Sequence, residues 1–187
     1  NSANDAAGIY TYGSAATFLD FSTVAANSAV GEGGGLYQDG SGTTTLKNSV
    51  VADNTASIGP DIGGTIDSQD YNHLENPTGG VFVTAANDVT GSDPALGSLV
   101  NNGGPTQTHH PSFVSVVLNT IPNGTNGCGT TVTSDQRGIT RPSSGSCDKG
   151  SVEVVAGTPT ATSTTTPSST ATNTTTPTAT AWSAATI

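Results

Sequence analysis

Charged residues are scarce in this sequence, and their scarcity narrows the possible functions. Only four Lys or Arg residues stand against fourteen Asp or Glu residues, so the 187-residue chain carries a net charge of −10. Binding to nucleic acid or to anionic lipid needs clustered cations, and the composition argues against both. Because charged residues make up only 10% of the chain, hydroxyls, amides or sugars must cover most of its surface.

The chain also lacks methionine, and aromatic residues make up only 5% of it. Any core must therefore be built mainly from small and β-branched residues. No apolar run approaches the ~20 residues of a membrane-spanning helix. The sequence has neither an initiator Met nor a basic and apolar leader at its start. We therefore expect a mature product or a fragment, and the composition favours a location outside the cell.

Internal repetition is the strongest pattern in the sequence. Gly8-Ile9-Tyr10 recurs 27 residues later as Gly35-Leu36-Tyr37. The same offset aligns Leu19 with Leu46, Ser22 with Ser49, Val24 with Val51 and Asn27 with Asn54. A third, altered copy runs over residues 61–74. Repeats of this length predict structural units that bury their apolar side chains by stacking on one another.

Each repeat contains short strand-like pieces separated by Gly, Asn or Asp, and no segment shows a helical period over ten residues. Glycine and asparagine at the corners allow the positive φ that sharp turns between short strands require. We therefore predict an all-β fold: a short right-handed parallel β-helix over residues 1–78. A β-rich C-terminal cap is expected over residues 79–156, and an extended Thr/Ser/Pro tail over residues 157–187.

Stacking predicts specific side-chain neighbours. Asp20 aligns with Lys47, which predicts an ion pair on the surface. Asn27 and Asn54 would lie one above the other, and two interpretations are open. The two side chains share amide hydrogen bonds, or each residue simply adopts a left-handed turn.

Two sets of motifs resemble known families. Gly33-Gly34-Gly35-Leu36-Tyr37 and the stretch Asn48 to Ala56 resemble repeats of bacterial surface β-helix proteins of the polymorphic outer-membrane type. Residues 93–97 (Asp-Pro-Ala-Leu-Gly) and 102–109 (Asn-Gly-Gly-Pro-Thr-Gln-Thr-His) are similar to the choice-of-anchor Q domain. Further matches lie at residues 135–138, 141–142 and 147–153, whereas residues 116–119 and 148–151 depart from the usual pattern. The resemblance implies an exported, surface-associated bacterial protein and supplies no catalytic residues.

Cys128 and Cys147 are the only cysteines. Two thiols in an exported chain predict one disulfide. Closing a loop of this size stabilises a protein by ~3 kcal/mol on the chain-entropy view. The bond would staple the C-terminal cap, which we expect to cover the last repeat.

Three of the four cations, Arg137, Arg141 and Lys149, lie close together in sequence. Neighbouring acids are Asp135, Asp148 and Glu153. One interpretation is a binding site for an anion or an acidic sugar. The interpretation that we favour is an ion-pair network inside the cap, where arginine forks satisfy carbonyls and carboxylates.

No group of residues in the sequence predicts catalysis. His109 and His110 are neighbours, so in a strand they point to opposite faces, and His73 lies near only one acid, Glu75. Asp61, Asp67 and Asp70 lie close in sequence but do not form a calcium loop. We predict no enzyme activity, no metal and no cofactor. Two alternatives are open: a monomeric cell-surface adhesin module, and a polysaccharide lyase or hydrolase on a β-helix scaffold, which needs two carboxylates facing one cleft.

The last 30 residues contain 14 Thr, 4 Ser and 3 Pro and no charged residue. This composition is typical of O-glycosylated stalks. Asn123 and Asn173 also match the N-glycosylation pattern. The hydroxyl candidates are Thr158, Thr160, Thr162, Ser163, Thr164, Thr165, Thr166, Ser168, Ser169, Thr170, Thr172, Thr174, Thr175, Thr176, Thr178 and Thr180.

The sequence favours identical subunits as the partners of this chain. No amphipathic helix precedes the first repeat, so its strand edge would be left open to another chain. A contact between unlike ends of identical subunits that does not close a ring gives a filament. We therefore expect a glycosylated, extracellular or cell-surface filament of subunits joined head to tail.

Overall fold

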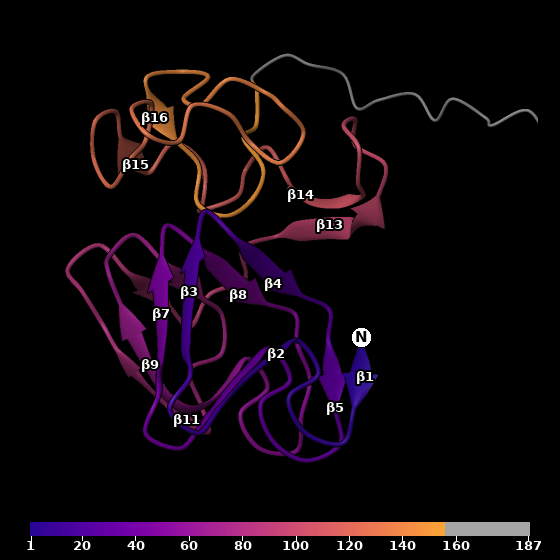
Figure 1. The fold of residues 1–187 in the computed structure, drawn as a ribbon. Helices are drawn as coiled ribbons and strands as arrows, with labels where there is room; N and C mark the ends of the chain where they lie inside the picture. Colours follow the sequence, from indigo (N-terminus) through magenta and orange to yellow (C-terminus); the bar gives the residue numbers. More distant parts are fainter. Residues whose placement is uncertain (156–187) are drawn as a thin grey trace, which may run out of the picture.

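The computed structural model describes residues 1–155, which form sixteen strands and no helix (Figure 1). The predicted all-β class is confirmed. Most strand pairs are parallel, and each of these joins strands that are far apart in sequence. The predicted Thr/Ser/Pro tail, with all its glycosylation candidates, lies outside the described residues.

Three parallel ladders are built by successive segments of the chain. The first contains β2 (Ile9–Tyr12), β6 (Leu36–Asp39) and the start of β9 (Ile62–Ser68). The second contains β3 (Ala16–Asp20), β7 (Thr43–Lys47), the rest of β9, and β11 (Gly80–Val83). The third contains β4 (Thr23–Ala25), β8 (Val50–Ala52), β10 (His73–Leu74) and β12 (Val89–Thr90). A two-residue ladder pairs β1 (Ser2–Ala3) with β5 (Ser28–Ala29).

The first two repeats pair in the register that the sequence predicts. Ile9 lies opposite Leu36, Leu19 opposite Leu46 and Val24 opposite Val51, each at an offset of 27 residues. The third repeat is shorter, because Thr44 lies opposite Ile66 and Val50 opposite His73. A fourth and still shorter repeat, β11 and β12, continues the parallel pairing to Thr90. The ladders therefore extend beyond residue 78, the boundary expected from composition.

The main core lies between the ladders and is aliphatic. It consists of Val24, Leu36, Leu46, Val51, Ile62, Ile66 and Leu74. Val24, Val51 and Leu74 occupy matching positions of successive strands, and so do Leu36 and Ile62. Burial of a Leu, Ile or Val side chain stabilises a fold by about 1.5–3 kcal/mol, which is the main driving force for stacking these repeats.

Close packing between successive repeats explains a glycine of the Gly-Gly-Gly-Leu-Tyr motif. A Cβ atom on Gly35 would lie 2.6 Å from the Asp61 carbonyl oxygen and 2.8 Å from Asn54 Nδ2. Both distances are far below van der Waals contact. The backbones of successive repeats approach so closely here that only glycine fits.

One corner is built in the same way in three successive repeats. Phe21, Asn48 and Tyr71 follow the ends of β3, β7 and β9, and their φ angles are 45°, 54° and 59°. Left-handed backbone is uncommon for residues other than glycine. Contacts with the rest of the chain must therefore hold these three residues in place.

The cap supplies those contacts. It contains a hairpin of β13 (Leu96–Val100) and β14 (Thr108–Pro111), and a small antiparallel pair of β15 (Ile121–Pro122) and β16 (Ser146–Cys147). Figure 1 shows the β15–β16 part of the cap beside the ends of β3 and β7. Phe21 packs against Ile121 and the two cysteines.

The sequence predicts a cap that covers the last repeat, but the cap contacts earlier repeats as well. Its backbone contacts reach the first repeat, where Ser151 N donates to Thr23 Oγ1 at 3.0 Å. They also reach the second, where Gly150 N donates to the Asn48 carbonyl at 2.7 Å. Lys149 Nζ donates to the carbonyl of Asn72 in the third, at 3.1 Å. The cap thus lies along the side of the ladders and clamps three repeats together.

Candidate functional site

Stacked side chains link the repeats at a second corner. Asn27 donates to Asn54 Oδ1 through its backbone N at 3.0 Å and its side-chain Nδ2 at 2.9 Å. Asn54 Nδ2 in turn donates to Asp61 Oδ1 at 2.8 Å. The left-handed positions are the preceding residues, Ala26 and Asp53, both with φ of 56°. Of the two interpretations, the shared amide bonds are therefore correct, and the left-handed turn is wrong for Asn27 and Asn54.

Asp61 ends this ladder in a buried environment. Its Oδ2 accepts a hydrogen bond from Asn76 N at 2.8 Å. Burial raises its pKa to about 6, although the bonds from Asn54 and Asn76 act in the opposite direction. Asp61 therefore titrates close to neutral pH while it supports the side-chain ladder.

The parallel ladders end in strand edges that are unpaired among the described residues. In the first repeat, β2, β3 and β4 each pair with the second repeat only. At the other end, β11 pairs only with β9, and β12 only with β10. Unpaired strand edges carry free N–H and C=O groups that accept another strand.

Large apolar side chains stand on these edge strands. Tyr12 on β2 is 69% exposed and Phe18 on β3 is 53% exposed. Val81 on β11, at the opposite end, is 59% exposed. Edge strands of soluble proteins usually carry charged residues or proline that prevent pairing. Both ends of these ladders combine open backbone with apolar surface instead.

Tyrosine rings form a stack that begins at the open edge. The rings of Tyr10 and Tyr37 lie 5.5 Å apart and nearly parallel, and Tyr37 lies opposite Gly63 in the next repeat. The Tyr10 hydroxyl donates to Asp39 Oδ2 at 2.8 Å, and this bond is the main reason that its pKa is raised. The nearby Glu32 carboxylate raises the pKa of Tyr37 to about 12. Both phenols are therefore neutral at pH 7.

The predicted Asp20–Lys47 pair is present between β3 and β7. Lys47 Nζ lies 2.9 Å from Asp20 Oδ2, and both side chains are partly exposed. The ammonium group also lies 5.4 Å from the centre of the Phe18 ring. This pair joins the first repeat to the second.

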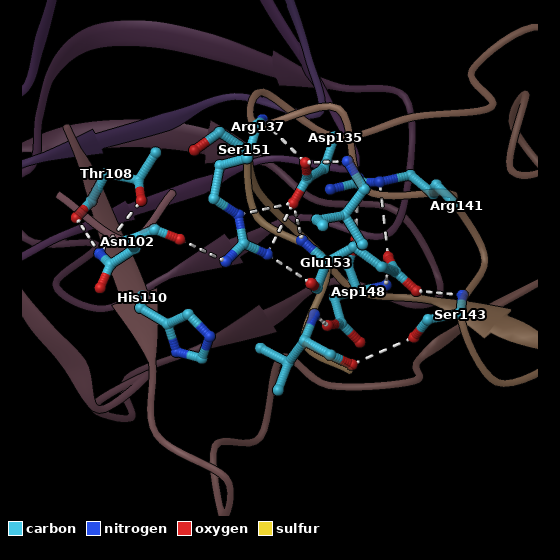
Figure 2. A network of polar contacts seen from close by, with 12 residues as sticks. Asn102, Thr108, His110, Asp135, Arg137, Arg141, Ser143, Asp148, Ser151 and Glu153 are labelled. Atoms are coloured by element: carbon cyan, nitrogen blue, oxygen red, sulfur yellow. Dashed lines mark hydrogen bonds and ion pairs between the residues drawn. The ribbon is translucent and has the colours of Figure 1, made fainter. Parts of the chain in front are cut away.

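Two cations of the cap, Arg137 and Arg141, bond to other groups within the cap, as Figure 2 shows. Asp135 Oδ2 accepts bonds from Arg137 Nη2 at 2.8 Å and from Glu153 N at 2.8 Å. Burial raises the pKa of Asp135, but these hydrogen bonds outweigh it and leave the pKa below its usual value. Arg137 also donates to the carbonyl oxygens of Asn102 and Glu153.

Arg141 is almost completely buried. Its Nη atoms donate to the carbonyls of Gly150 and Asp148, and its Nε lies 3.4 Å from Glu153 Oε2. The guanidinium carbon lies 4.3 Å from the Phe21 ring centre, which is a cation–π distance. These contacts favour the ion-pair network over an anion site, because the guanidinium groups have protein partners already.

Lys149 departs from the predicted cluster. Its ammonium group donates to the carbonyls of Asn72 and Asn87, at 3.1 Å each, instead of pairing with the acids of the cap. Burial lowers its pKa, and Asp88 and Asp70 partly offset that effect. The sequence places Lys149 near Asp148 and Glu153 but holds no sign that it reaches the ladders.

Cys128 and Cys147, the pair predicted from the sequence, are bonded, with their sulfur atoms 2.07 Å apart. Both are fully buried beside Phe21 and Ile121. The bond therefore lies in the small apolar cluster through which the cap contacts the corner of the ladders.

The three histidines make separate contacts, and so do Asp61 and Asp70, two of the acids considered for calcium. His73 is buried and contacts the Ser92 carbonyl, while His109 and His110 contact the Gly97 and Pro111 carbonyls. Asp61 and Asp70 make separate contacts, with Asn54 and with Asn87. Within residues 1–155, no three His, Cys, Asp or Glu side chains are grouped so as to hold a metal ion.

Of the glycosylation candidates, only Asn123 lies among the described residues, and it is exposed. Asn173 and the Thr and Ser candidates from Thr158 to Thr180 lie outside them. In the described part of the chain, no helix has the length and apolar character needed to span a membrane. No protein-family model, curated protein or solved structure matches this chain.

Proposed function

We propose that this chain is a non-catalytic structural subunit that assembles head to tail into an extracellular or cell-surface filament. In this proposal, residues 1–90 wind as a short right-handed parallel β-helix. Support comes from the order of the strands, because successive strands of one repeat join different ladders and the next repeat returns to each ladder in turn. The aliphatic core between the ladders fits the same winding.

The main support for the proposal is that, among the described residues, the parallel ladders have unpaired strand edges at both ends. Backbone edges and exposed apolar side chains occur together at both ends of the ladders, with Tyr12 and Phe18 at one and Val81 at the other. Both ends belong to parallel ladders, so a second copy in the same orientation can continue them. The cap lies along the side of the ladders and leaves both ends free for this contact within the described residues.

Glycans complete the proposal. The chain is poor in charge, and its tail has the composition of O-glycosylated stalks. Sugars on the tail and on the exposed Asn123 would keep such a polymer soluble. The resemblance to bacterial surface repeats and to the choice-of-anchor Q domain favours the same location.

Electron microscopy and light scattering of residues 1–187 test the proposal. We expect polymers that lengthen with concentration, and Tyr12→Lys with Phe18→Lys should shorten them strongly, because charge on an edge blocks strand pairing. The matched control is Val114→Lys, since Val114 is 89% exposed but lies outside the ladders. Discrete monomers at all concentrations would overturn the filament. Glycan binding by such monomers would favour the adhesin alternative.

A further inference from the structure

The cap contains an apolar groove that the filament proposal does not use. Its volume is about 550 Å³, and it lies between the β13–β14 hairpin and the loop that carries Arg137. The apolar walls are formed by Leu96, Val100, Pro111, Phe113, Ile139 and Val155. Ligand pockets of proteins have this size and this mixture of apolar walls and a few polar groups.

One polar group in the groove lacks a partner. Ser112 Oγ is buried and makes no hydrogen bond with any described residue. Buried hydroxyls normally have a partner, so an unpaired one needs an explanation. Ser112 lines the same groove as Phe113, which is 57% exposed. The groove therefore offers an apolar surface, and one of its lining residues holds a buried hydroxyl without a hydrogen-bond partner in the described part of the chain.

We propose that Trp182 of the same chain docks into this groove. Val155 lines the groove and is also the last described residue, so the chain continues from the groove's own wall. In the sequence that follows, Trp182 and Ile187 are the only large apolar residues. Trp182 is moreover the only tryptophan in the chain.

The chemistry of an indole ring fits the groove. Tryptophan buries a large apolar area and carries a single N–H donor that seeks a partner when buried. Rotation of the Ser112 side chain about χ1 would bring its unpaired Oγ into the groove as an acceptor for that donor. Phe113 and His110 lie with their rings tilted 5.9 Å apart, and both belong to the groove lining. An indole can add to this aromatic pair edge to face.

Connection through the chain favours the chain's own tryptophan over that of another copy. Twenty-six residues separate Val155 from Trp182. A chain of this length reaches at most about 90 Å when fully extended, so its contour length allows Trp182 to lie at the groove. Tethering gives an effective concentration on the order of millimolar. This proposal does not depend on filament formation.

Fluorescence of the single tryptophan tests the docking directly. The full chain carrying Tyr12→Lys and Phe18→Lys is used, so that polymerisation does not bury Trp182. We expect emission that is blue-shifted from free indole in water, and several-fold weaker quenching by acrylamide. Val100→Asp and Phe113→Asp should return both values to those of free indole. Val114→Asp, the matched control, should leave them unchanged.

Three outcomes would overturn the proposal or one of its parts. Emission equal to free indole in the starting chain would overturn docking, provided that circular dichroism shows a folded protein. A blue shift lost on dilution would assign the groove to a second copy and overturn docking within the chain. Ser112→Ala should raise quenching, and unchanged quenching would overturn the hydrogen bond assigned to Ser112.

Discussion

The ladders of residues 1–90 and the cap of residues 91–155 have interiors of different chemistry. The ladders enclose an aliphatic core in which Leu46 and Ile66 are completely buried. The cap buries charged groups instead, and Arg141, Asp148 and Glu153 are among its least exposed residues. The comparison teaches that a chain poor in large apolar residues can build part of its interior from hydrogen bonds and ion pairs in place of an aliphatic core.

The largest predicted effect tests the interior of the cap. Arg141→Ala removes the guanidinium that bonds the Gly150 and Asp148 carbonyls and leaves Glu153 buried without its cation. Loss of one partner of a buried ion pair costs about 3–5 kcal/mol. We expect denaturant unfolding to show this loss.

Arg137→Ala is the control for the Arg141 variant, because Arg137 is less buried and should cost less. Leu46→Ala provides the comparison with the ladders, where a cavity costs about 2–5 kcal/mol. An Arg141→Ala protein as stable as the parent would show that the charged network does not support the cap.

The ladders could be predicted from the sequence much better than the cap. A 27-residue offset places Leu19 on Leu46 and Asn27 on Asn54, because stacked repeats use the same residue type at the same position. The third copy is recognised in altered form over residues 61–74. Nothing periodic marks the still shorter fourth repeat, so the pairing of residues 80–90 was not foreseen.

The side-on position of the cap could not be predicted because its contacts are too distant in sequence. Ser151 bonds Thr23 across 128 residues, and Lys149 reaches Asn72 across 77. No local pattern encodes such pairs. Among cap features, the disulfide was predictable from the cysteine count, and the apolar groove had no signal in the sequence at all.

The second prediction separates the two regions through the disulfide. Replacing both Cys128 and Cys147 by Ser should cost about 3 kcal/mol, because the bond closes a loop of about twenty residues. We expect hydrogen exchange to speed up first in the cap, while amides of β7 and β9 keep their protection. Reductant should destabilise the parent and leave the double variant unchanged. Equal loss of protection in both regions would show that they unfold as one unit.

The third prediction compares one carboxylate in each region by its pH dependence. Burial raises the pKa of Asp61 in the ladders, and of Asp148 in the cap, to about 6 from 3.8. The folded state therefore holds these protons more tightly than the unfolded state, so stability falls as pH rises from about 4 to 6. Each group contributes about 3 kcal/mol over this change, since one pKa unit corresponds to about 1.4 kcal/mol.

Chemical denaturation at pH 4, 5, 6 and 7 measures this dependence. Asp61→Asn and Asp148→Asn should each flatten the slope between pH 4 and 6. Below pH 4 the lowered pKa of Asp135 acts in the opposite direction, because that carboxylate loses its stabilising bonds on protonation. Stability that rises from pH 4 to 6 would contradict the raised pKa values.

The smallest effect is expected at the surface ion pair. Lys47→Gln removes the charge that lies 2.9 Å from Asp20 Oδ2, but both side chains are partly exposed. Such pairs contribute about 0.2–1 kcal/mol, and salt weakens them. Denaturant unfolding of the variant and the parent should therefore converge as salt is added.

Asp20→Ala is a sharper probe of the same pair, because it also removes an acceptor of Asn48, the residue that contacts the cap. Asp20 Oδ1 accepts a bond from Asn48 Nδ2 at 2.9 Å, and the same Nδ2 donates to the carbonyl of Asn126 in the cap at 3.0 Å. Asn48 is fully buried, so its amide depends on these acceptors. We expect the Asp20 variant to lose more stability than the Lys47 variant, and to keep that loss at high salt. Equal losses of stability in the two variants, both absent at high salt, would show that the bond to Asn48 does not stabilise the contact between cap and ladders.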